Sequence, residues 1–157
     1  MTYREALRTN LPAALGGDPR AVERLLAAFR PIVGRYCRAR LGGDGGTFLA
    51  ADEIAQRACL SVLAALPRYP DQSRPFLAFV YDIAAATVDG VAGPRPGHPL
   101  DRLPAAQRDV VILRTVVGLS TEETAEAIGM SPAGVRLTQH RALARLRAVT
   151  KPESGTG

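Results

Sequence analysis

The sequence predicts an all-α protein made of two small helical domains that are joined by a short linker rich in Gly and Pro. Three observations support this. Gly and Pro divide the 157 residues into segments of helical length. No segment shows the period-2 alternation of a convincing strand. Residues 91–99 carry little that could form a core, so the predicted domains are residues 1–90 and 100–150, followed by a disordered tail at 151–157.

The composition is compatible with this fold and favours an anionic partner. Hydrophobic residues make up 46% of the chain, while aromatic residues make up only 5% and Trp is absent, so aliphatic side chains must fill the core. The formal net charge is +5, which favours an anionic partner. Lys151 is the one lysine among 20 basic residues, a bias that suits phosphate contact but that a GC-rich genome also explains.

The cysteines and the apolar segments exclude several functions. Cys37 and Cys59 lie in apolar helical patterns, which predicts buried free thiols, with a disulfide as the alternative. We expect no metal and no cofactor, because the sequence supplies no ligand set. No apolar run is long enough to span a membrane, and no signal peptide is present, so we expect a cytoplasmic protein without a membrane partner.

The first domain begins with a helix inside residues 2–15. Asp18 is then an N-cap and Pro19 the first residue of a second helix, which runs to about Leu41. Pro31 is expected to kink or divide this helix, and the "GGDGG" sequence at 42–46 ends it.

Residues 50–66 predict an amphipathic helix with a polar outer face formed by Asp52, Glu53, Gln56 and Arg57. Residues 67–75 are expected to form a loop, and a further helix runs from Phe76 to near Gly90. The predicted inner face of the helix at 50–66 comprises Ile54, Ala55, Ala58, Cys59, Val62, Leu63, Ala65 and Leu66.

The second domain has the pattern of a helix-turn-helix. One helix runs from near Pro104 to Gly118. Ser120 and Glu123 have the spacing of a capping box, and Gly129 ends the helix that they start. Its inner positions are Thr124 or Ala125, and Ile128. A short turn containing Gly then leads to Ser131 as N-cap and Pro132 as the first residue of the last helix.

The last helix has one inward and one basic outward face. Val135, Thr138 or Gln139, Ala142 and Leu146 recur at helical spacing, and no acidic residue lies between Glu126 and Glu153. The early residues of such a helix reach base edges in a major groove, where Arg pairs with guanine or with phosphate. A solvated basic helix is the alternative. The predicted DNA-binding residues are Ser131, Arg136, Leu137, His140, Arg141 and Arg145.

Residues 103–147, "LPAAQRDVVILRTVVGLSTEETAEAIGMSPAGVRLTQHRALARLR", resemble region 4 of bacterial sigma factors, the domain that reads the −35 promoter element. The resemblance rests on the Leu-Pro start, the Gly-Leu-Ser and Glu-x-x-Ala motifs, Val-Arg, and His-Arg-Ala-Leu. LuxR-type regulators have a similar helix-turn-helix but lack this start and the Arg-Ala-Leu ending.

The first domain resembles region 2 of the extracytoplasmic-function (ECF) group of the sigma-70 family, in an actinobacterial form. "GDPRAVERLLAAFRPIVGRYCRARLG" is similar to region 2.1, "ADEIAQRACLSVLAALPRYPD" to region 2.2, and "RPFLAFVYDIAAATV" to region 2.3. The resemblance implies binding to the β′ and β subunits of core RNA polymerase and to promoter DNA, commonly under the control of an anti-sigma protein, with no small-molecule substrate. It assigns Asp52, Glu53, Gln56 and Arg57 to the polymerase contact.

The stretch after Val88 departs from the family. Members have basic and polar residues there that open the −10 element, whereas no Lys or Arg lies between Arg74 and Arg95, and Asp82 and Asp89 are acidic. The connection is also short, since ten to twelve residues reach about 35–40 Å at most when fully extended. Three hypotheses follow: an ECF sigma factor that directs initiation, a sigma-like regulator that binds polymerase, DNA or an anti-sigma protein without opening promoters, or a plain DNA-binding regulator of LuxR type.

An enzyme is not expected. "GGDGG" lacks the strand–loop–helix frame and the Lys of a phosphate-binding loop. Asp52 and Glu53 point about 100° apart on a helix and make a poor catalytic pair.

Overall fold

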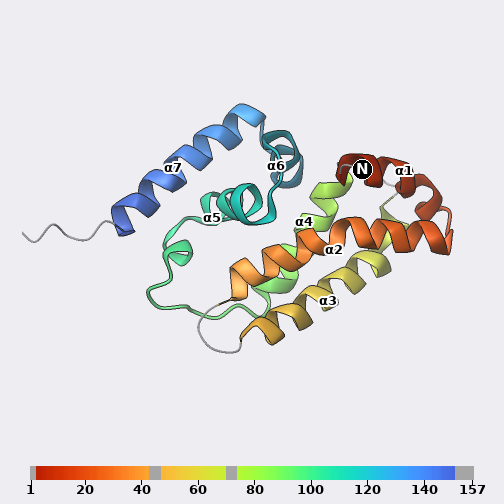
Figure 1. Ribbon diagram of the computed structural model, residues 1–157, viewed down its shortest axis with the longest axis horizontal. Helices are drawn as coiled ribbons and strands as arrows, with labels where there is room; N and C mark the ends of the chain where they lie inside the picture. The colour runs from red at the N-terminus through yellow and green to blue at the C-terminus, as the bar shows by residue number, and fades with distance from the viewer. Residues whose placement is uncertain (1–2, 43–46, 70–73, 151–157) are drawn as a thin grey trace, which may run out of the picture. The chain divides into compact units, whose positions relative to one another are not determined.

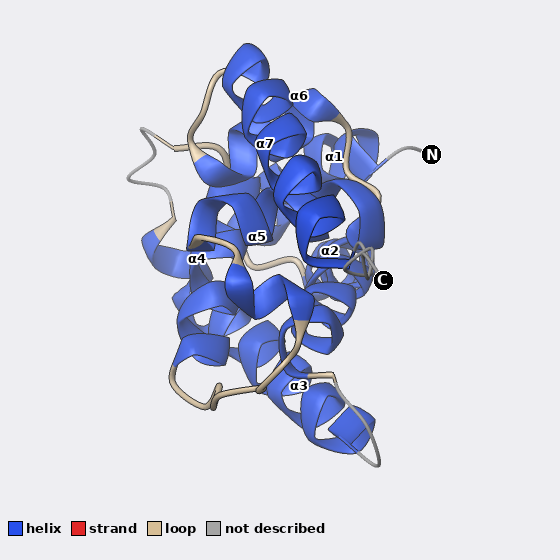
Figure 2. Ribbon diagram, turned by 90° about the vertical axis from the view of Figure 1, so that its left-hand side faces the viewer, coloured by secondary structure: helices blue, strands red, loops and turns tan. Residues whose placement is uncertain are grey.

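A computed structural model describes residues 3–42, 47–69 and 74–150 (Figure 1). The chain divides into two compact units, Met1–Ala92 and Gly93–Gly157. The secondary structure drawn for the described part is helical, with loops between the helices and no strand (Figure 2). The predicted all-α class is therefore confirmed.

Unit 1 is built around one long helix. Its helices are α1 (Tyr3–Leu15), α2 (Pro19–Leu41), α3 (Thr47–Ala65) and α4 (Phe76–Asp89), with a 3₁₀ turn at Leu66–Arg68. Helix α2 packs against α1, α3 and α4. It does so through buried residues that recur every four positions: Leu25, Phe29, Val33 and Cys37.

The start of α2 follows the sequence prediction, whereas Pro31 does not divide the helix. The Asp18 side chain accepts a hydrogen bond from the backbone N–H of Arg20, and Pro19 is the first helical residue. The helix is continuous through Pro31, which lies on the exposed side, opposite the buried stripe. The "GGDGG" break is described only at Gly42, which caps the helix.

Helix α3 has the predicted faces. Ile54, Ala58 and Val62 are buried, while Leu63 and Ala65 are partly buried. Beyond α3, the predicted loop is in part a 3₁₀ turn, and four aromatic rings pack around it. The ring centroids of Tyr69 and Phe76 are 5.1 Å apart. The cluster comprises Phe29, Tyr69, Phe76 and Phe79.

Unit 2 contains a 3₁₀ turn at Pro99–Arg102, α5 (Ala105–Val111), a π-helical turn at Ile112–Val117, α6 (Thr121–Ile128) and α7 (Pro132–Thr150). The predicted helix stops are confirmed: Gly118 has φ +87° and Gly129 φ +79°, which is the left-handed region that favours glycine. The core is formed by Leu103, Val110, Val111, Ala125, Val135 and Ala142.

Part of the predicted linker is folded and belongs to unit 2. Arg95 donates hydrogen bonds to both carboxylate oxygens of Asp101, with Nη2 2.7 Å from Oδ1 and Nε 3.1 Å from Oδ2. His98 Nδ1 accepts the backbone N–H of Leu100 at 3.3 Å and caps the 3₁₀ turn. The predicted tail, residues 151–157, lies outside the described residues.

Candidate nucleic-acid and polymerase interfaces

The first turns of α6 and of α7 are each fixed by a capping side chain. Ser120 Oγ accepts the backbone N–H of Glu123 at 3.0 Å, and the Glu123 carboxylate accepts the backbone N–H of Ser120 at 2.8 Å. Ser131 Oγ accepts the backbone N–H of Gly134 at 3.0 Å. The predicted capping box is confirmed, and Ser131 caps α7.

The rotation of α7 about its own axis is set by its inward side chains. Val135 and Ala142 are fully buried. Arg114, in the π-helical turn, donates from Nη1 to the Leu119 carbonyl at 2.6 Å and from Nε to Gln139 Oε1 at 3.2 Å. One guanidinium therefore joins the preceding helix, the turn and α7. This role of Arg114 could not be predicted from the sequence, since no local pattern distinguishes Arg114 from the other arginines.

The structure places the predicted DNA-binding residues on one exposed face. Arg136, His140, Arg141 and Arg145 are exposed, and Leu137 projects among them. Helix α7 carries no acidic residue, so nothing on it neutralises these arginines. The arrangement can donate to phosphates and to guanine edges.

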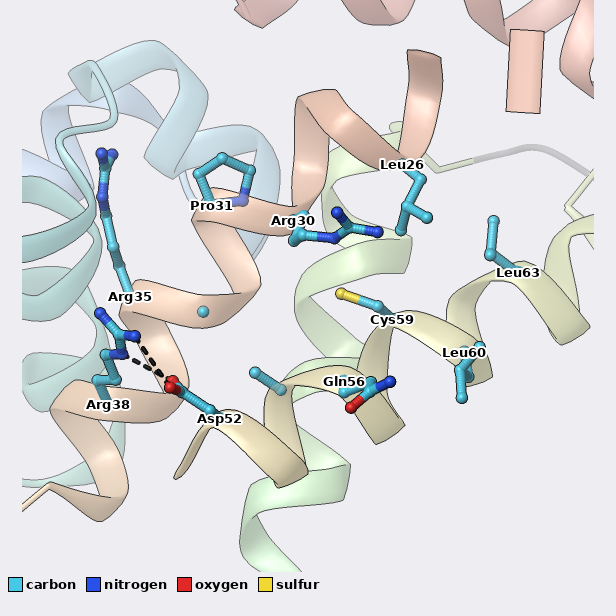
Figure 3. Close-up of a pocket in the computed structure, with 12 residues that line it drawn as sticks. Leu26, Arg30, Pro31, Arg35, Arg38, Asp52, Gln56, Cys59, Leu60 and Leu63 are labelled. Atoms are coloured by element: carbon cyan, nitrogen blue, oxygen red, sulfur yellow. Dashed lines mark hydrogen bonds and ion pairs between the residues drawn. The ribbon is translucent and has the colours of Figure 1, made fainter. Parts of the chain in front are cut away.

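The predicted polymerase-contact residues also share one exposed face, on α3. Asp52, Glu53, Gln56 and Arg57 are all exposed. Asp52 is not isolated, because Arg38 on α2 donates to it from Nε at 2.8 Å and from Nη2 at 3.0 Å (Figure 3). These hydrogen bonds lower the pKa of the Asp52 carboxyl below its usual value.

A groove of about 650 Å³ lies beside this face, between α2 and α3 (Figure 3). Its walls combine apolar side chains with three arginines, and Leu60 at its edge is 60% exposed. The groove could not be predicted from sequence periodicity, because the walls of the groove come from two helices. The lining residues are Leu26, Arg30, Pro31, Gly34, Arg35, Arg38, Asp52, Ala55, Gln56, Cys59, Leu60 and Leu63.

The acidic residues of α4 are paired within unit 1. Arg40, whose side chain is only 6% exposed, donates to Asp89 Oδ1 at 2.6 Å and to the Tyr36 hydroxyl at 2.6 Å. Arg74 pairs with Asp82 on the surface. Both carboxylates of this stretch are therefore paired with arginines of unit 1, and the Asp89 pair holds a buried guanidinium.

The two cysteines of unit 1 are buried. Cys37 and Cys59 are free and buried, as predicted. Burial raises the pKa of the Cys37 thiol to about 12 and also raises the pKa of Cys59. In the described part of the chain, no three His, Cys, Asp or Glu side chains group as metal ligands, and no helix there is long and apolar enough to cross a membrane.

Known proteins resemble the chain along most of its length. Residues 100–146 match the family "Sigma-70, region 4". The ECF RNA polymerase sigma factor SigD of Mycobacterium tuberculosis is 43% identical over 176 positions, which cover 91% of this chain and 83% of the relative. The ECF RNA polymerase sigma factor ShbA of Streptomyces griseus is 38% identical over 177 positions, covering 88% of this chain and 92% of the relative.

A solved structure is similar in fold. CnrH, determined in complex with the cytosolic domain of CnrY, matches with a TM-score of 0.72 and 25% identity, covering 92% of this chain and 96% of CnrH. The SigD alignment has 176 positions, more than the 157 residues of this chain, so the relative has residues inside the matched span that this chain lacks. With these relatives, the chain belongs to the ECF group of bacterial RNA polymerase sigma factors.

Proposed function

We propose that this ECF sigma factor reads the −35 element with the outward face of α7 and binds core RNA polymerase with the outward face of α3. The observation that carries the proposal is the acid-free face of α7, on which Arg136, Leu137, His140 and Arg141 project together from a capped helix. In this proposal the protein acts as a cytoplasmic initiation factor and not as an enzyme.

Reading of DNA by α7 is supported by how the helix is held. Val135 and Ala142 anchor its inner side, and Arg114 ties Gln139 to the preceding turn. The outward side chains therefore project from a rigid support, which favours defined hydrogen bonds to base edges. Arg136 and Arg141 are the proposed base or phosphate contacts, and Arg145 a later phosphate contact.

Docking to core polymerase is supported by the exposure of Asp52, Glu53, Gln56 and Arg57 along α3. The relatives SigD and ShbA are named as RNA polymerase sigma factors, which favours initiation over a regulator that never opens promoters. CnrH was solved with a partner protein, and we propose that this chain likewise has a protein partner of the anti-sigma class.

In this proposal, unit 1 is the region 2-like domain and unit 2 the region 4-like domain. Asp82 and Asp89 pair with arginines of their own unit, so α4 supports the fold without offering positive charge to the −10 phosphates. Promoter opening then depends on core polymerase and on the remaining side chains of unit 1.

Run-off transcription tests the proposed function. Purified chain is added to core polymerase from a Streptomyces or Mycobacterium species, with genomic promoter fragments as template. The expected result is a set of specific transcripts that are absent with core polymerase alone. Tight binding to core polymerase without any specific transcript would contradict initiation and favour the sigma-like regulator.

A further inference from the structure

An apolar side chain stands in the middle of the basic face of α7. Leu137 is 49% exposed, and it is one of four large hydrophobic side chains that are exposed in the described residues. A single exposed leucine needs no explanation. Its position is informative, because its neighbours on the helix surface are His140 and Arg141.

Helix geometry places Leu137 opposite the core. Successive residues turn by about 100°, so Leu137 points about 200° away from the buried Val135. His140 lies about 60° to one side of it and Arg141 about 40° to the other. Leu137 is therefore near the centre of the face that the proposed function lays against DNA, with His140 and Arg141 on the following turn and the small residues Ala133 and Gly134 on the preceding one.

In a complex with DNA, Leu137 gains free energy from burial only where it meets an apolar group. The edges of the base pairs present hydrogen-bond donors and acceptors in the major groove, and the C5 methyl group of thymine is the one apolar group among them. A phosphate or a guanine edge would gain nothing from Leu137, whereas packing a methyl group against it removes apolar surface from water.

We propose that Leu137 is a specificity-determining residue that packs against the C5 methyl group of one thymine in the −35 element, within reach of Arg136 and Arg141. The inference rests on the proposed function of α7. It adds that the recognised element contains a thymine whose methyl group is read, and that this reading is separable from the contacts of the arginines.

The test uses the complete chain bound to core polymerase. Duplexes that this holoenzyme binds are first selected from a random library, and each thymine of the enriched element is then replaced singly by deoxyuridine, which lacks the methyl group. Wild-type holoenzyme should lose affinity about fourfold at one thymine, as the burial of one methyl group predicts. Leu137→Ala should show no loss at that thymine.

Val116→Ala is the matched control, since Val116 is 47% exposed in the same unit but lies outside α7. The Val116→Ala holoenzyme should lose the same affinity as wild type when that thymine is replaced by deoxyuridine. The Leu137→Met holoenzyme should lose part of that affinity. Circular dichroism checks that Leu137→Ala is folded. If no sequence is enriched, the proposed function of α7 fails; if an element is enriched but every deoxyuridine affects wild type and Leu137→Ala equally, the inference about Leu137 is overturned.

Discussion

At the scale of single residues, the first prediction concerns the two early arginines of α7. Replacing both Arg136 and Arg141 by Ala should weaken holoenzyme binding to the −35 element at least about 30-fold, because each contact to a base contributes about 1–3 kcal/mol. The dependence of affinity on salt should also become shallower if either arginine contacts a phosphate. Titration of labelled duplex at several salt concentrations measures both effects.

Arg24→Ala is the control for this pair of substitutions, since it removes one exposed positive charge from α2. It should leave affinity for the −35 element nearly unchanged. An unchanged affinity in the double variant would show that α7 is not the recognition helix.

The second prediction concerns the buried thiols. Burial raises the pKa of Cys37 to about 12, so the thiol stays protonated at pH 8. Native protein should react with an aromatic disulfide reagent far more slowly than free cysteine, whereas denatured protein should expose two reactive thiols. A thiol of native protein that reacts at the rate of free cysteine would contradict the buried environment.

The sign of the pH effect on stability follows from the same shift. The folded state holds the Cys37 proton more tightly than the unfolded state, whose pKa is near 9.0. The contribution of Cys37 to the free energy of unfolding is therefore complete below pH 9 and falls as the pH rises towards 12. Cys37→Ala is the suitable reference for this pH dependence of the free energy of unfolding. Cys37→Ser would add a buried hydroxyl and so is not suitable.

At the scale of elements, the tie between α2 and α4 gives the third prediction. Asp89→Asn should lower the free energy of unfolding by about 1–2 kcal/mol, because the buried Arg40 guanidinium loses a charged hydrogen-bond partner. Asp82→Asn is the control, since its pair with Arg74 is exposed on both sides, and it should cost less than about 0.5 kcal/mol. Urea unfolding followed by circular dichroism measures the difference, and equal effects would contradict it.

The outer face of α3 gives the fourth prediction. Asp52→Asn combined with Gln56→Ala should lower affinity for core polymerase at least about tenfold, as expected for residues at the centre of an interface. Glu23→Gln, on the exposed side of α2, should have no effect. Retained core affinity in the double variant would remove both residues from the proposed interface. Pull-down or surface binding with purified core polymerase provides the measurement.

The features of the elements that could be predicted from the sequence are those that depend on residues close together in the chain. Caps such as Asp18 and the Ser120–Glu123 box depend on residues two or three positions apart, and the faces of α3 and α7 depend on period, so both were predictable. The Arg38–Asp52 and Arg40–Asp89 pairs join residues 14 and 49 positions apart, and no local pattern encodes them. The sequence therefore predicted that α4 is acidic, but it could not predict that Asp82 and Asp89 pair with arginines of unit 1.

At the scale of the whole molecule, the connection between the two units is shorter than the sequence indicates. Val91 and Ala92 both donate backbone hydrogen bonds to the Val88 carbonyl, which extends the ordered end of α4. Arg95 is already held by Asp101. The connection without such hydrogen bonds therefore reduces to Gly93 and Pro94, of which Pro94 has a fixed φ.

The last prediction follows from this short connection. Two residues span only about 7 Å, and we expect so short a connection to restrict the promoter spacing that the chain can serve. Inserting six Gly and Ser residues after Gly93 should broaden the range of distances between the −35 element and the transcription start at which run-off transcription occurs. The same insertion after Lys151, in the C-terminal tail, is the control and should leave that range unchanged. A spacing profile that is identical for both insertions and for the wild type would show that the connection does not limit promoter geometry, and that this spacing is set by core polymerase alone.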